Sequence, residues 1–125
     1  MSMDLQVWSR KPFDLPAQLC ESGAWTSYPA PSAVRASGES YAYETESWQV
    51  EVLTGTAKSN PVPNSIKAIS PELLHVAFLT LEPIGADADG YAFLERTVRE
   101  LARRNDGRWL GPDGLHAYSA NEGTL

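Results

Sequence analysis

The segment from Leu73 to Asp113 constrains the fold most, because it contains an apolar strand followed by a long amphipathic helix. Apolar side chains occupy both alternating positions between Leu74 and Leu81. This pattern is typical of a central strand that is covered on both faces of a sheet. The strand should end at Pro83, which has no N–H to donate to a neighbouring strand. One face would carry Leu74, Val76, Phe78 and Thr80, and the other Ala77, Leu79 and Leu81.

The helix that follows has an apolar stripe of the width needed to pack on a sheet. Asp87 and Asp89 are candidate N-caps, and Asn105-Asp106-Gly107 should end the helix with glycine near the C′ position. On its polar side Glu95 is spaced for an ion pair with Arg99, and Glu100 for one with Arg104. The predicted stripe consists of Tyr91, Leu94, Val98, Leu101 and Ala102.

Two antiparallel strands are predicted upstream, Tyr41–Glu44 and Trp48–Leu53, joined by Thr45-Glu46-Ser47. Trp48, Val50 and Val52 would share the core face of the second strand. The remaining elements are shorter. They are a strand from Leu5 to Ser9, a helix with Leu15, Leu19 and Cys20 on its apolar side, a helix or turn at Ile66–Ile69 with Ser70 as an N-cap, and a strand at Arg108–Leu110.

The order of elements predicts an α+β fold with a mainly antiparallel sheet, and with one long and one short helix packed on one face. It is compatible with a ferredoxin-like split βαβ variant. Residues 1–125 should form a single domain, with residues 114–125 as an irregular or loosely docked tail. For residues 24–38 the sequence leaves two alternatives, a brief strand at Trp25 and Tyr28 or a loop.

The net charge of −6, from sixteen acidic against ten basic residues, argues against nucleic acid and anionic membrane as partners. No apolar run is long enough for a membrane span, and the N-terminus lacks the pattern of a signal peptide. The single Cys20 cannot form an intramolecular disulfide, which fits a reducing compartment. We therefore expect a cytoplasmic protein.

No catalytic, metal-binding or cofactor-binding motif is evident. His75 and His116 are far apart in sequence and, with one cysteine, give no recognised zinc spacing. Asp87 and Asp89 lack the glycine and glutamate of a calcium loop, so helix capping is the simpler role. The arginines of the long helix are most simply a solvated face with intrahelical ion pairs. We expect no cofactor and no enzymatic activity.

The candidate binding region is the acidic, aromatic strand pair. Tyrosine often dominates interface energetics, and a negative field speeds association with a basic partner. The alternative is that the aromatic side chains fill the core while the acids keep the protein soluble. The predicted partner-binding residues are Glu39, Tyr41, Tyr43, Glu44, Glu46 and Glu51.

The chain resembles the small acidic immunity proteins of bacterial polymorphic toxin systems. The resemblance lies in the N-terminal strand and helix, in the spacing of Tyr43 and Trp48, and in the segments 79–83 and 107–113. It implies a cytosolic, non-enzymatic inhibitor that occludes a cognate toxin, with a basic toxin domain as the partner. No family contact residue can be transferred, because no specific motif aligns.

Two other functions remain open at this point. One is a small-ligand-binding or enzymatic domain with a pocket between the sheet and the long helix, containing His75 or Arg96. The other is a homodimeric structural module joined through a sheet edge, since the sequence does not define the oligomeric state.

Overall fold

Seven strands and three helices follow one another along the part of the chain that the structure describes. The computed structural model describes residues 3–19, 25–29, 39–82 and 88–123. In chain order the elements are β1 (Met3–Ser9), α1 (Leu15–Leu19), β2 (Thr26–Pro29), β3 (Glu39–Glu44), β4 (Gln49–Thr56), α2 (Asn64–Ile69), β5 (His75–Glu82), α3 (Ala88–Arg104), β6 (Gly107–Leu110) and β7 (Ala117–Tyr118).

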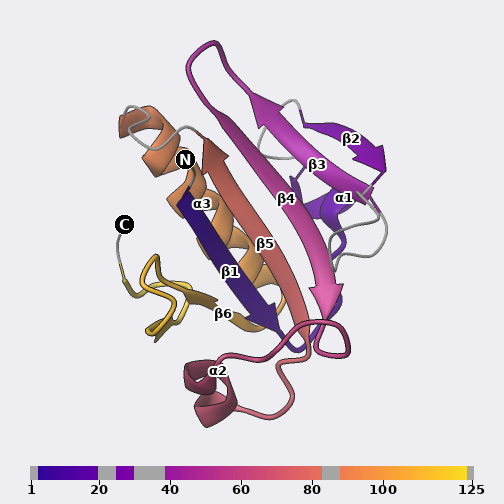
Figure 1. Ribbon diagram of the computed structural model, residues 1–125, viewed down its shortest axis with the longest axis vertical. Helices are drawn as coiled ribbons and strands as arrows, with labels where there is room; N and C mark the ends of the chain where they lie inside the picture. Colours follow the sequence, from indigo (N-terminus) through magenta and orange to yellow (C-terminus); the bar gives the residue numbers. More distant parts are fainter. Residues whose placement is uncertain (1–2, 20–24, 30–38, 83–87, 124–125) are drawn as a thin grey trace.

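All seven strands form one antiparallel sheet in the order β2-β3-β4-β5-β1-β6-β7 (Figure 1). β5 lies between β4 and β1, which confirms the central position predicted from its two apolar faces. Leu79 sits opposite Val52 on one side and Leu5 on the other. β2 shows that part of the 24–38 region is a strand; Cys20, Pro83 and Asp87 lie outside the described residues.

The connections form two interlocked units. β1 lies antiparallel between β5 and β6, so β5 and β6 run parallel to each other and are joined through α3. In the same way β5 separates β1 from β4, and the chain passes from β1 to β4 through α1, β2 and β3. The α+β prediction is confirmed, with a larger sheet than the sequence analysis expected.

α1 and α3 pack on the same face of the sheet. Figure 1 shows α3 running behind the central strands. The predicted apolar stripe is buried except for the half-buried Tyr91, and Phe93 and Thr97, which the stripe did not include, are buried as well. Each fully buried leucine or valine contributes roughly 1.5–3 kcal/mol. The core on this face includes Leu5, Val7, Val50, Val52, Leu79 and Leu81 from the sheet, Leu15 and Leu19 from α1, and Leu94, Val98 and Leu101 from α3.

The predicted packing of the long helix and one short helix on the same face is confirmed by α3 and α1. The segment predicted as a helix or turn at 66–69 forms α2, which lies on the other face. Ile66 of α2 is buried in a second apolar cluster, with Trp8 and Val76, on the face opposite α3. These two sheet residues are fully buried and cross-strand neighbours, so their large apolar surface requires a cover on that side. Ser70, predicted as an N-cap, is instead the C-cap of α2.

At the end of α3, the residue in the left-handed conformation is not the glycine that was predicted. Asp106 has φ 53°, so it provides the turn that was expected from glycine. Gly107 is the first residue of β6. A glycine is needed there because of the close approach to β1, and not because of the helix end. A Cβ at this position would lie 2.5 Å from the backbone oxygen of Trp8. The glycine therefore allows β6 to approach β1.

The C-terminal segment, predicted to be irregular or loosely docked, is docked on β6 and contains a short strand, β7. β7 pairs with β6, and the indole nitrogen of Trp109 donates to the carbonyl oxygen of Ser119 at 3.1 Å. The Arg99 guanidinium donates to the carbonyl oxygens of Ala120 (2.9 Å), Glu122 (3.2 Å) and Gly123. Arg99 also lies 5.5 Å from the Trp109 ring centroid. One side chain of α3 therefore fastens several backbone groups of the tail.

The ion pairs predicted along α3 are present. Arg99 lies 3.4 Å from Glu95, and Arg104 lies 2.7 Å from Glu100. Among the described helices, none combines the length and apolar character that crossing a membrane requires.

We expect Gly107→Ala to lower the free energy of unfolding by about 2 kcal/mol, because the new methyl group would meet the backbone of β1. Asp106→Gly should change it by less than about 1 kcal/mol, since glycine accepts the positive φ and the Asp106 ion pair with Arg10 is exposed. Urea unfolding measures both values. The opposite ranking would contradict this account of the helix end.

We expect Arg99→Lys to loosen the tail without unfolding the sheet, because an ammonium group cannot reproduce the planar fork that reaches three carbonyls. Hydrogen exchange should quicken at residues 117–123 and stay unchanged in β4 and β5. Arg103→Lys, on the exposed side of the same helix, is the matched control. Equal exchange in the two variants would show that Arg99 does not hold the tail.

Candidate interaction surface

The hairpin between β3 and β4 is closed by Thr45. Its backbone N–H donates to the carbonyl oxygen of Trp48 at 2.8 Å, and its hydroxyl accepts from the N–H of Trp48 at 3.0 Å. The N–H of Ser47 also donates to this hydroxyl, at 3.2 Å. These bonds set the register in which Glu44 faces Gln49 and Tyr43 faces Val50. The predicted tight connection is confirmed.

The alternation of β3 places Tyr41 and Tyr43 on one face of the sheet and Glu44 on the other. Tyr41 and Tyr43 lie on the α3 side, half-buried against the core. The Tyr43 ring centroid is 4.4 Å from that of Phe93 and 5.9 Å from that of Trp48. Glu44 follows on the other face. The tyrosines thus extend the core, as the alternative reading of the strand pair held.

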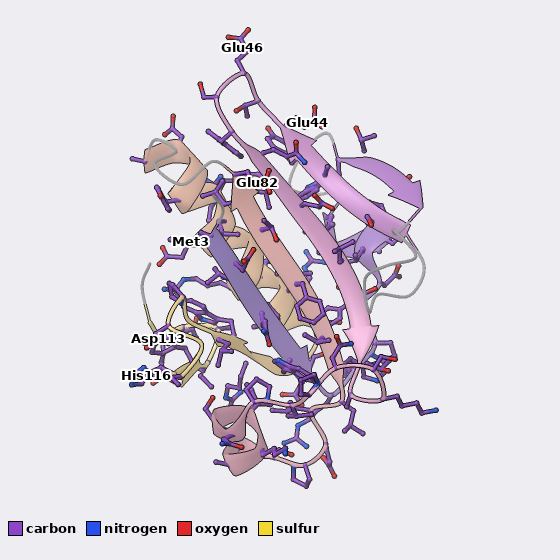
Figure 2. All side chains as sticks on the ribbon, in the orientation of Figure 1. Met3, Glu44, Glu46, Glu82, Asp113 and His116 are labelled. Atoms are coloured by element: carbon purple, nitrogen blue, oxygen red, sulfur yellow. The ribbon has the colours of Figure 1, made fainter. Side chains whose placement is uncertain are left out.

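The six predicted partner-binding residues do not form one patch. Glu44 and Glu51 share the face away from α3, whereas Tyr41 and Tyr43 lie on the core side. Figure 2 shows Glu46 at the hairpin tip, where it is exposed. Glu39 begins β3 opposite Pro29, and the structure describes only its backbone.

The structure adds two acids to Glu44 and Glu51 that the sequence analysis missed, Asp4 and Glu82. Gln49 lies between Glu44 and Glu82 across three neighbouring strands. In the next row Thr80 lies between Glu51 and Asp4, and its hydroxyl donates to the Asp4 carboxylate at 2.9 Å. Directly opposite residues in a sheet are about 5 Å apart.

We define this acidic sheet face by its four acids, Asp4, Glu44, Glu51 and Glu82. Their positions follow from strand alternation, but their proximity follows from strand order, which the sequence alone did not supply.

Apolar side chains border the acidic sheet face at the end nearer α2. Leu53 and Phe78 are directly opposite each other on β4 and β5, and Gln6 of β1 lies opposite Phe78 on its other side. Leu53 and Phe78 are half-buried. Phe78 also touches the cluster that α2 covers, so the apolar surface continues from beneath α2 into the uncovered part of the sheet.

Positive charge is absent from the four strands that carry this face. β1, β3, β4 and β5 contain no lysine or arginine. Within the described part of the chain, no lysine or arginine forms an ion pair with Glu44, Glu51 or Glu82. Arg96, Arg99, Arg103 and Arg104 lie on α3 instead. The two sides of the sheet therefore differ in charge.

Two pockets lined by described residues lie at opposite ends of β4. One, of about 300 Å³, is lined by Glu44, Thr45, Trp48, Gln49 and Glu82. The other, of about 250 Å³, is lined by Pro12, Phe13, Thr54, Gly55, Thr56 and His75.

The alternative hypothesis placed a pocket between the sheet and the long helix, with His75 or Arg96 in it. The second pocket includes His75, but neither of these two pockets includes a residue of α3. Arg96 is exposed, with its guanidinium 5.8 Å from the Phe93 ring centroid.

Among residues 3–19, 25–29, 39–82 and 88–123, no group of three histidine, cysteine or acidic side chains is placed to hold a metal ion. His116 pairs with a single carboxylate, that of Asp113, through its Nδ1 at 2.6 Å. This pair lies in the turn before β7 (Figure 2).

Hydrogen bonds in the turn at Asp113 lower the pKa of its carboxyl group. The backbone N–H of Leu115 donates to the Asp113 carboxylate at 2.9 Å, and His116 adds its side chain and its backbone N–H. Led by the Leu115 bond, these contacts lower the pKa of Asp113 from 3.8 to about 2. Hydrogen bonds from Ser119 likewise lower the pKa of Glu122. Both acids order the tail by holding its turns.

Comparison of the chain with protein-family models, with curated proteins and with solved structures gave no match.

The lowered pKa of Asp113 predicts an acid-sensitive tail. The folded state favours the carboxylate, so its contribution is complete above pH about 4 and is lost as the pH falls towards 2. NMR titration should give a midpoint near pH 2 for Asp113, and Asp113→Asn should abolish the matching shift changes at residues 115 and 116. A midpoint near 4 would contradict this role.

Proposed function

We propose that this protein is a non-enzymatic binding protein that neutralises a basic protein partner, in the manner of the immunity proteins that the sequence resembles. One observation carries the proposal. Four carboxylates gather on a sheet face whose strands contain no lysine or arginine, and beyond α2 no described helix or strand lies over its central strands. Unbalanced charge of one sign speeds association with a partner of the opposite sign.

The arrangement of the sheet is consistent with a protein whose role is to present a surface. The space between the sheet and α3 is filled by buried apolar side chains, and the two pockets described above, at the ends of β4, include no residue of α3. A basic toxin domain, acting in the same cytoplasm, is the partner class that this charge suits. Binding at its functional surface would block the toxin.

We also propose that the inner strands, in the order β6-β1-β5-β4, are a variant of the ferredoxin-like arrangement. The two split units, with α1 and α3 on one face, support this assignment. β2 and β3 would then be an insertion between α1 and β4, and β7 an addition at the opposite edge.

The function is tested by co-expression with the product of the neighbouring gene in the source genome. We expect that product to stop growth when expressed alone and this chain to restore growth. A harmless neighbouring product, or growth arrest that this chain does not relieve, would contradict the proposal.

With a purified partner, Glu44→Lys combined with Glu51→Lys should slow association at least about tenfold at low ionic strength. Folding should be unaffected, because both side chains lie outside the core. Asp14→Lys combined with Glu72→Lys makes the same change in charge at exposed positions elsewhere and is the matched control. Equal association rates for the two double variants would exclude steering by this face.

A further inference from the structure

We propose that the acidic sheet face, with Leu53 and Phe78 at its edge, is the docking site for one basic amphipathic helix of the partner protein. This inference deepens the proposed function and rests on it for the partner being a protein. The sequence analysis suggested the β3–β4 strand pair as the binding region. The proposed docking site is instead centred on β1, β4 and β5.

The two halves of this side of the sheet differ in what covers them. At one end α2 packs through Ile66 on Trp8 and Val76, which are fully buried. Towards the other end the same face continues through Phe78, Thr80 and Glu82. In Figure 1 no described helix or strand lies in front of β1, β5 and β4 beyond α2. Among the described elements, a helix therefore covers one half of this face and none covers the other half.

The size of the uncovered area suits one helix. Three strands span roughly 10 Å, and the four-residue step from Phe78 to Glu82 spans roughly 13 Å. A helix with its side chains is about 10–12 Å wide. A helix laid beside α2 would cover Leu53 and Phe78 with apolar side chains and place its flanking residues over the acids.

The charge decides what kind of helix can lie there. Asp4, Glu51 and Glu82 surround Thr80 on three neighbouring strands, and no lysine or arginine is present in those strands. A helix with lysine or arginine beside an apolar stripe would complement both features. A second copy of this chain would instead bring like charges together on the same patch, and nucleic acid would meet repulsion.

The surface is tested first by NMR, with a designed helical peptide of about 18 residues in which lysines flank a leucine stripe. We expect the amide shift changes to concentrate at Gln6, Leu53, Phe78 and Thr80, and to weaken with added salt. The same peptide with glutamate in place of lysine should cause none of them. Shift changes confined to another surface, or no changes, would overturn the inference.

Thr80→Arg provides the matching variant. The new guanidinium would lie between Asp4 and Glu51, so the fold should tolerate it while the patch loses negative charge and space. Peptide affinity should fall at least about tenfold. Ala92→Arg makes the same charge change at an exposed position of α3 and should leave the affinity unchanged. Equal affinities for the two variants would overturn the inference.

The growth assay separates this inference from the proposed function. If the natural chain and Thr80→Arg both relieve toxicity, inhibition stands but docking on this face is wrong. If the natural chain relieves nothing, the proposed function fails, and the peptide measurements alone decide whether the face binds basic helices. Relief by the natural chain and its loss in Thr80→Arg would support both.

Discussion

Burial of the apolar stripe of α3 against β1, β4 and β5 is the interaction on which the rest of the structure depends. It removes the largest continuous apolar surface from water, and α1 and the rings of Tyr43 and Trp48 extend the same core. Because side chains alternate along a strand, fixing which face meets α3 also fixes which face does not. The position of every acid in the central strands follows from this one contact.

The two faces of the sheet have consequently taken different roles. The α3 side is apolar and filled, with the tyrosines of β3 serving as its margin. The opposite side is divided between a small apolar cluster under α2 and an acidic area further along the same strands. Concentrating like charges on a folded surface is costly unless solvent or a partner of opposite sign surrounds them. A basic partner of the kind proposed above would reduce this repulsion between the acids of the acidic sheet face.

Specific polar contacts act at the C-terminal edge of the fold, beside the packing of Trp109 and Tyr118 on the core. Arg99 fastens the carbonyls of the last residues, and Asp113 and Glu122 hold the turns around β7 with hydrogen bonds that also lower their pKa values. At the end of α3, Asp106 turns the chain so that Gly107 can approach the backbone of β1.

The sequence by itself determined the elements whose signals are local. The apolar runs and alternation defined the central strand, the hairpin and the stripe of α3, and the spacing of Glu95 with Arg99 defined an ion pair. Only the tertiary structure decided the strand order, the placement of α2 on the second face, the docking of the tail, and the union of Asp4, Glu51 and Glu82 on one surface. Residues far apart in the chain create these features through pairing between strands and contacts between layers, and no local periodicity encodes which strand will lie beside which.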